Sequence, residues 1–369
     1  FFCEREKVEF YYFCCFGHLE AMEVSMTKCT SRELLVGLCG AASNGQTQVV
    51  QSLLDYGLDG VSLTKALLHA CRKGHVDCVK MLLKDNRVSP TAECILHACE
   101  GGHGQVLDLL LRDGRIDPGQ DFFFESARRG NVLERLLQDN RVDPSIHDNY
   151  AIVSASIDGN EAVVELLLQD PRVDPQTDNN YAIRAACYHG HLAVCELLLP
   201  HVDPSVDDNN PIGLASKNGH PDVVALLLSD DRCDPSADEC AALRWACENG
   251  HVDTVKLLLD DPRLDPSSSD NYAILLASRN GHLGVVELLL EHEKTDPSAR
   301  SNYAIRLASY EGFADVVEVL LRDPRVDPTD RDNYSVYRAI ERQHHNVVEV
   351  LMRDKRVSES LKSVIGLQT

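Results

Sequence analysis

Histidine and cysteine are the side chains of this chain whose numbers first suggest chemistry. The 369 residues include 15 His and 14 Cys, which could serve as metal ligands, nucleophiles or acid–base catalysts. Eight histidines, however, share one recurring position after a glycine or its equivalent: His18, His75, His103, His191, His220, His251, His282 and His344. Neighbouring layers of packed helices lie about 10 Å apart, so residues that recur once per layer cannot share an ion. We interpret them as structural and predict no metal site.

The cysteines follow the same logic. Four of them stand directly after an alanine, in a position where other segments carry Ser278 or Ser309: Cys71, Cys99, Cys187 and Cys247. A small side chain that packs between helices explains this position. No CxxC pair occurs, and no spacing resembles that of a zinc site. We therefore expect reduced thiols and a reducing, cytoplasmic compartment.

Catalytic motifs are equally absent. Gly101-Gly102-His103-Gly104 is rich in glycine, but it lacks the third spaced glycine and the preceding strand of a phosphate-binding loop. No Ser or Cys stands out from its counterparts elsewhere in the chain as a nucleophile with a base beside it. We predict no catalytic residue and no cofactor, and thus a protein that is not an enzyme.

Composition narrows the classes of partner. The formal net charge of −22 argues against binding a nucleic-acid backbone, which requires clustered Lys and Arg. Hydrophobic residues make up 44% and charged residues 25%, as in a soluble folded protein. No run reaches the roughly 18 to 20 apolar residues that span a bilayer. We expect neither nucleic acid nor membrane as a partner.

A repeat explains why most motifs recur. Asp-Pro pairs begin at 203, 234, 265, 296 and 327, so they return at a constant interval. Glycines mark corresponding positions at 17, 45, 74, 102, 130, 159, 190, 219, 250, 281 and 312, and Gln343 takes this position in the last unit. Such self-similarity predicts a stack of about twelve small units. We assign residues 6–357 to one solenoid, with 28- or 29-residue units first and mostly 31-residue units later, and 358–369 to a C-terminal tail.

Each unit is expected to contain two antiparallel helices. In the unit that runs from 271 to 297, residues 272–279 form a short first helix with an apolar or small face. Gly281 closes it, because the chain must reverse there. Residues 282–291 form a second, amphipathic helix, and Asp296-Pro297 forces an extended exit.

The second helix and its preceding glycine resemble the ankyrin repeat. The match is best in two segments, Asn218-Gly219-His220-Pro221-Asp222-Val223-Val224-Ala225-Leu226-Leu227-Leu228 and Asn280-Gly281-His282-Leu283-Gly284-Val285-Val286-Glu287-Leu288-Leu289-Leu290. The resemblance covers residues 6–357 and implies an all-α helix-turn-helix solenoid with short β-hairpin-like loops, in which the recurring histidine ties the turn by hydrogen bonding. Tetratricopeptide and HEAT units are longer and lack this motif.

Two departures from the family pattern are visible. The Thr-Pro-Leu-His opening of the first helix is replaced by Tyr-Ala-Ile-Arg, as at Tyr181-Ala182-Ile183-Arg184 and Tyr303-Ala304-Ile305-Arg306, so we expect Asn180 or Asn302 to cap the helix instead. The later units are also shorter than those of the family, which usually have about 33 residues. This difference places the shortening in the hairpin fingers.

The resemblance implies a non-enzymatic protein–protein interaction scaffold that binds its partner in a concave groove of inner helices and fingers. Trp, Tyr and Arg dominate binding hot spots. The candidate partner-binding residues therefore include Trp245 and the variable positions before the turn glycine: Tyr188, His189, Lys217, Asn218, Trp245, Glu248, Asn249, Arg279, Asn280, Tyr310 and Glu311. Trp245 could instead fill a packing gap.

We expect the protein to be a monomer. The alternative is the substrate-recruiting arm of a larger adaptor or effector, such as a ubiquitin-ligase adaptor, with its functional domain outside this chain.

Overall fold

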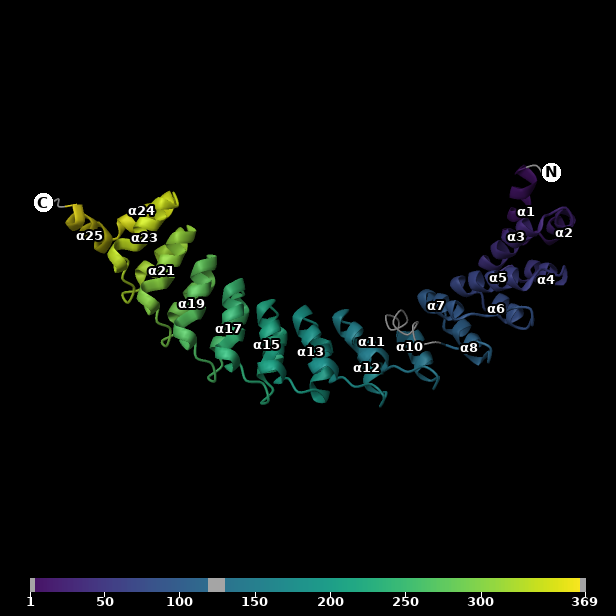
Figure 1. The fold of residues 1–369 in the computed structure, drawn as a ribbon, viewed down its shortest axis with the longest axis horizontal. Coiled ribbons are helices and arrows are strands. Elements are labelled where there is room, and N and C mark those ends of the chain that lie inside the picture. Colours follow the sequence, from purple (N-terminus) through teal and green to yellow (C-terminus); the bar gives the residue numbers. More distant parts are fainter. Residues whose placement is uncertain (1–3, 119–129, 366–369) are drawn as a thin grey trace. The chain divides into compact units, whose positions relative to one another are not determined.

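The computed structural model describes residues 4–118 and 130–365, and these ranges contain helices and no strand (Figure 1). They divide into two compact units, residues 1–174 and 175–369. None of the described helices is long and apolar enough to cross a bilayer. The predicted all-α repeat fold is confirmed. The assignment of 6–357 to one solenoid remains a prediction.

The first unit stacks its helices in two layers. One layer contains α1, α3, α5 and α7, and the other contains α2, α4, α6, α8, α10 and α12. The helix bounds are α1 (Glu4–Phe16), α2 (Leu19–Met26), α3 (Ser31–Ser43), α4 (Thr47–Asp55), α5 (Gly60–Lys73), α6 (Val76–Leu83), α7 (Ala92–Gly101), α8 (Gly104–Arg112), α10 (Gly130–Leu137), α11 (Ile146–Ile157) and α12 (Glu161–Leu168).

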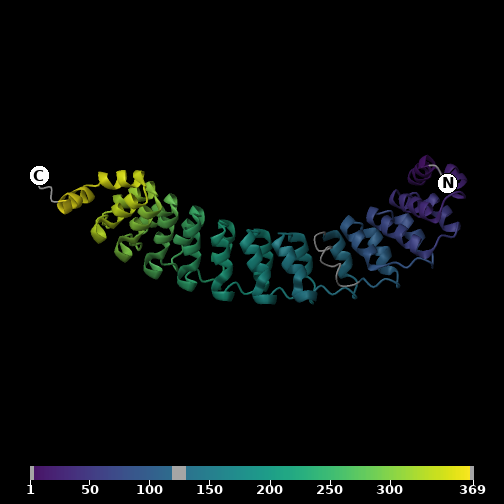
Figure 2. The same cartoon turned by 45° about the horizontal axis from the view of Figure 1, so that its top comes forward.

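The second unit repeats this arrangement. Its first helices, α13 to α23 in odd numbers, follow one another side by side (Figures 1 and 2). Its second helices, α14 to α24 in even numbers, contact one another in the same order and form the second layer. The bounds are α13 (Thr177–His189), α14 (Leu192–Leu198), a 3-10 turn η1 (Leu199–His201), α15 (Val206–Lys217), α16 (Pro221–Leu228), α17 (Ala237–Asn249), α18 (Val252–Leu259), α19 (Ser268–Asn280), α20 (Leu283–Glu291), α21 (Ala299–Glu311), α22 (Ala314–Arg322), α23 (Asp330–Glu341), α24 (His345–Arg353) and α25 (Lys355–Ile365). Helix α25 includes most of the segment assigned to a tail.

The core lies between the two layers, where the sequence pattern places it. In α20, Val285, Val286 and Leu289 are fully buried, which is the i, i+1, i+4 spacing of an amphipathic helix. Gly281 has φ +76°, and a Cβ there would lie 2.5 Å from the Phe313 ring of the next repeat, so only glycine fits. The predicted packing role of the four cysteines after alanine is confirmed, because all four are buried.

The loops differ from the expected hairpins. Seven successive repeats, from the one with α11 to the one with α23, each contain three consecutive residues in left-handed backbone conformations. In Arg300-Ser301-Asn302, for example, φ is 54°, 60° and 52°. Before them, the Asp of Asp-Pro accepts hydrogen bonds from the backbone and hydroxyl of the residue two positions on, as Asp296 does from Ser298. The Asp-Pro turn and the three left-handed residues take up the part of the loop where a hairpin was expected, so no residues remain there to pair as strands.

Six of the seven left-handed turns end in an asparagine, which bonds to the following repeat rather than capping its own helix, and the seventh ends in Cys240. The Oδ1 of Asn302 accepts a hydrogen bond of 2.7 Å from the backbone N–H of Asp327, and Asn180 donates to the Asp203 carbonyl at 2.9 Å. Among the described residues, no hydrogen bond runs from either side chain to the helix that follows it, and Nδ2 of Asn302 donates to Asp330, again in the following repeat. The capping role expected for these two residues was therefore wrong. Because both side chains are buried, each bond joins two adjacent loops out of contact with water.

The recurring histidines also bond between repeats. Nε2 of His220, His251 and His282 each donates to a backbone carbonyl near the end of the preceding first helix, over 3.0, 2.9 and 2.9 Å. The same bond occurs at His75, His103 and His344. The hydrogen-bonding role implied by the resemblance is confirmed, and the bond ties each turn to its neighbour.

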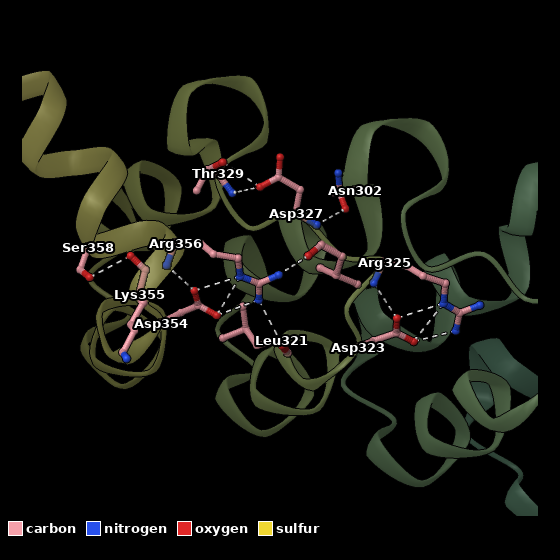
Figure 3. A network of polar contacts seen from close by, with 11 residues as sticks. Asn302, Leu321, Asp323, Arg325, Asp327, Thr329, Asp354, Lys355, Arg356 and Ser358 are labelled. Carbon is pink, nitrogen blue, oxygen red and sulfur yellow. Dashed lines mark hydrogen bonds and ion pairs between the residues drawn. The ribbon is translucent and has the colours of Figure 1, made fainter.

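An Asp-x-Arg motif, overlooked in the sequence, forms the most extensive link between repeats. In Asp261-Pro262-Arg263, the carboxylate pairs with the guanidinium over 2.7 Å. The same guanidinium donates to the carbonyls of Cys233 and Leu228 in the preceding repeat, over 2.9 and 3.0 Å. Leu228 ends α16, so the arginine satisfies a helix C-terminal carbonyl that has no partner within its own helix. Figure 3 shows two successive copies of this clamp, at Arg325 and Arg356.

The clamp occurs eight times among the described residues. Its arginines are Arg87, Arg115, Arg141, Arg172, Arg232, Arg263, Arg325 and Arg356. In the second unit, the loop from α20 to α21 has His292-Glu293-Lys294 in its place. The backbone there keeps the clamp geometry, because Nδ1 of His292 accepts from the N–H of Lys294 at 3.3 Å as the aspartate would. This loop therefore has the shape of a clamp without the guanidinium.

Completing the clamp at this loop should stabilise the second unit. We expect His292→Asp combined with Lys294→Arg to raise the free energy of unfolding by about 1 kcal/mol, because a charged donor would reach the carbonyls at the end of α18. Urea unfolding would measure the change, and amide hydrogen exchange at 259–264 would locate it. Lys294→Gln is the matched control. Unchanged stability and exchange would contradict the role given to the clamp.

The clamps also predict how stability depends on pH. Hydrogen bonding from Arg263 lowers the pKa of Asp261, and the other seven pairs behave alike. A pKa that is lower in the folded chain means that the pair stabilises the fold at neutral pH. This stabilisation is lost as pH falls from the unfolded value, about 3.9, through the folded one. The difference in urea midpoint between wild type and Asp261→Asn should shrink below about pH 4. A constant difference down to about pH 3 would contradict this.

Candidate functional site

The residues predicted from sequence lie at the C-terminal ends of the first helices α13, α15, α17, α19 and α21. Three of them have structural bonds. The Nδ2 groups of Asn218 and Asn249 donate to the carbonyl four residues back in their own helix, each over 2.8 Å. Asn280 donates to the carbonyl of Glu248 in the preceding repeat over 3.0 Å. These amides therefore hold the helix ends.

Trp245 lies against Gly213 of the preceding repeat. A Cβ at Gly213 would come within 2.5 Å of the indole ring, so the ring occupies the space that a side chain would need. The ammonium of Lys217 lies 5.9 Å from the ring centroid. The neighbouring depression, of about 220 Å³, is acidic and includes Asp207, Asp208, Asp234 and Asp238. The indole ring thus packs against the preceding repeat and also lines this depression.

A larger groove lies over α19, α21 and α23. It has a volume of about 550 Å³ and is lined by four tyrosines, three arginines, three leucines and one glutamate: Tyr272, Tyr303, Tyr310, Tyr334, Arg279, Arg306, Arg338, Leu275, Leu276, Leu307 and Glu311. The groove contains Arg279, Tyr310 and Glu311 from the sequence prediction. It does not include Tyr188, His189, Lys217, Trp245 or Glu248.

Tyrosine rings and guanidinium groups alternate along this groove. The guanidinium carbon of Arg306 lies 4.9 Å from the ring centroid of Tyr303 and 4.8 Å from that of Tyr334. The guanidinium carbon of Arg338 also lies 4.8 Å from the Tyr334 ring centroid. Cation–π contacts of this kind contribute about 0.5 to 2 kcal/mol each, depending on desolvation. The four side chains therefore hold one another in fixed positions.

Arg306 is the most constrained member of this stack. It is only 7% exposed, and its Nη1 donates to the backbone carbonyls of Arg300 and Ser301 over 3.5 and 3.1 Å. Its Nε is buried without a hydrogen-bond partner. Burial lowers the pKa of Arg306, and the nearby charge of Arg331 lowers it further. The groove thus contains a desolvated cation.

Sequence reasoning missed Tyr272, Tyr303, Tyr334 and Arg306 because they belong to the recurring opening of the first helix, which we interpreted as architecture. A usable signal was present. Tyr303, Arg306, Leu307 and Tyr310 are spaced i, i+3, i+4, i+7, and Tyr272, Leu275, Leu276 and Arg279 have the same spacing. This spacing places four side chains on one helix face, and two such faces in adjacent repeats make a continuous surface.

The described residues contain no cluster suited to a metal ion. Within 4–118 and 130–365, no group of three or more His, Cys, Asp or Glu side chains is arranged to hold a metal ion. Burial raises the pKa of the Cys99 thiol to about 12, so it stays protonated and unreactive at neutral pH. The groove instead presents rings, guanidinium groups and one carboxylate, which suit recognition of another molecule's surface.

A family model described as ankyrin repeats, in three copies, matches overlapping segments along the chain: 10–94, 38–122, 123–208, 150–238, 183–270, 212–301 and 274–360. No curated protein matches the chain significantly. Ankyrin repeats generally mediate protein–protein interactions, and the family is generally a non-enzymatic scaffold. Since the matches extend from residue 10 to residue 360, the chain belongs to the ankyrin repeat proteins.

Proposed function

We propose that this protein is a non-enzymatic interaction scaffold that binds a partner protein in the groove over α19, α21 and α23. The observation that supports this most strongly is the gathering of four tyrosines and three arginines in one open groove of about 550 Å³. Tyr and Arg are enriched in the few residues that provide most of the affinity at protein interfaces. Their concentration in three successive repeats favours a binding surface.

The groove is also preorganised. Tyr303, Arg306, Tyr334 and Arg338 already contact one another in the free protein. On the adjacent turn, Arg342 lies 4.0 Å from the centroid of Tyr310 and donates to its hydroxyl. Ordering a long side chain on binding costs about 0.5 to 1.5 kcal/mol, and these side chains avoid much of that cost.

The proposal also includes candidate residues that were predicted from sequence and lie outside the groove. We propose that Tyr188, His189, Lys217, Trp245 and Glu248, on α13 to α17, extend the contact surface beyond the groove. A monomeric state, a reducing compartment and the lack of nucleic-acid binding also remain predictions. The adaptor alternative would use the same groove to recruit a substrate.

The test compares two tyrosines from the same repeat position. We expect Tyr303→Ala to weaken capture of groove partners at least tenfold, since a hot-spot tyrosine contributes about 2 kcal/mol or more. Tyr181→Ala is the matched control, because Tyr181 likewise packs on an arginine, with Arg184 lying 5.2 Å from its ring centroid, but lies outside the groove. Quantitative mass spectrometry of proteins captured by each variant would measure the effect.

Thermal unfolding of each variant would serve as the folding control. Proteins that are lost from Tyr303→Ala but kept by Tyr181→Ala and by wild type would be groove partners. If both variants retained every captured protein at wild-type levels, or lost the same proteins equally, the groove would not be the binding surface and the proposal would fail.

A further inference from the structure

The fourth position of the Tyr-Ala-Ile-Arg opening holds an arginine in three repeats of the second unit, and one of these arginines differs from the others. Arg184 pairs with Asp207 over 3.7 Å, and Arg244 pairs with Asp238 over 3.2 Å. Arg306 forms no ion pair with any carboxylate among the described residues, although it is the most buried of the three. The same position is thus neutralised in two repeats and left charged in the third.

The cause lies six residues earlier, at the first residue of the left-handed turn. This position holds Asp178, Asp207 and Asp238 in three successive repeats, and these aspartates surround Arg184 and Arg244. In the last two repeats the position holds Arg300 and Arg331. Arg306 therefore has arginines where its counterparts have carboxylates. The side chain at this position is therefore negative in some repeats and positive in others, and the left-handed turn is the same in all of them.

Nearby acids do not make up for this loss. Asp330 influences the pKa of Arg306, but its carboxylate accepts a hydrogen bond of 2.8 Å from Asn302 instead. Arg300 has its own partner, Asp270, over 3.5 Å. Arg338 pairs with Glu341 outside the groove lining. Among the residues that line the groove, Arg279, Arg306 and Arg338 face a single carboxylate, that of Glu311.

An unpaired buried charge is costly, and a carboxylate with good geometry relieves that cost. We propose that the groove binds an acidic peptide segment of the partner, with one Asp or Glu carboxylate pairing with Arg306; this rests on the function proposed above. The aromatic rings pack against the segment's carbon chain, and Arg279 and Arg338 attract its other acids. The net charge of −22 does not prevent this, because charges beyond about 8 Å are screened at physiological salt.

The experiment begins with a selection. A displayed library of random 12-residue peptides is selected on the full chain, and groove binders are defined as those lost with Tyr303→Ala. We expect these binders to be enriched in Asp and Glu. The affinity of one enriched peptide is then measured against its Glu→Gln form and against protein variants, with an expected loss of at least tenfold for Glu→Gln and for Arg306→Gln.

A second variant keeps the buried arginine and supplies its missing partner. Arg300→Asp restores the carboxylate found at Asp178 and Asp238, so Arg306 becomes neutralised within the protein. We expect it to weaken the acidic peptide at least tenfold. Because the variant also loses the Arg300–Asp270 pair, circular dichroism at the assay temperature confirms that it is folded. Arg322→Asp is the matched control for net charge, because Arg322 is exposed on α22 outside the groove, and it should leave affinity within twofold.

The outcomes separate this inference from the function on which it rests. Groove binders without acidic enrichment, or an acidic peptide unaffected by Arg306→Gln and Arg300→Asp, would overturn the carboxylate assignment and leave the groove as a binding surface. A selection that yields no peptide dependent on Tyr303 would overturn both. Equal losses for Arg300→Asp and Arg322→Asp would show that net charge alone sets the affinity, and this too would overturn the role of Arg306.

Discussion

The fold depends on one requirement, which is that each repeat must satisfy the open end of the helix before it. The second helix of a repeat ends with backbone carbonyls that have no partner in their own helix. The arginine of the following Asp-x-Arg motif supplies the donors, as Arg356 does for Leu321 and Val326 (Figure 3). Its aspartate holds the guanidinium in place, so the arginine bonds to both repeats at once.

This link explains why the repeats have such uniform loops. The clamp, the asparagine bond and the histidine bond all run between neighbouring repeats, from three different places in a repeat. Single repeats differ at one of these places, as at Cys240, Lys294 and Phe313. Each of these bonds fixes the spacing of backbone atoms in two repeats rather than one. A solenoid is stabilised by such nearest-neighbour contacts, because a single repeat buries too little apolar surface to fold alone.

A rigid frame of this kind allows side chains to vary without disturbing the backbone. The first residue of the left-handed turn is Asp238 in one repeat and Arg300 two repeats later, with φ of 45° and 54°. The change from acid to base reverses the local charge while the turn persists. The acidic depression beside Trp245 and the arginine-rich groove beside Tyr303 thus arise from the same architecture.

Much of the fold was predictable from single residues. Gly281 and the apolar spacing of Val285, Val286 and Leu289 located the turn and the core, because local backbone geometry and burial follow directly from residue type. The groove was only partly predictable. Arg279 and Tyr310 were identified as variable positions, but Arg306 looked like every other arginine of its motif, since only the stacking of repeats brings Arg331 and Tyr334 to it.

The sequence by itself determined the repeat, the helix pair and the recurring turn, because the constant interval between Asp-Pro pairs and the pattern within it depend on neighbours along the chain. Only the tertiary structure decided which histidine, asparagine and arginine bonds cross between repeats, and it replaced the expected hairpins with left-handed turns. It also decided that Arg306 lies between two tyrosines without a carboxylate. The groups that surround a charge in space decide whether it is paired. For Arg306 these groups include Tyr334, which the stacking of repeats brings next to it.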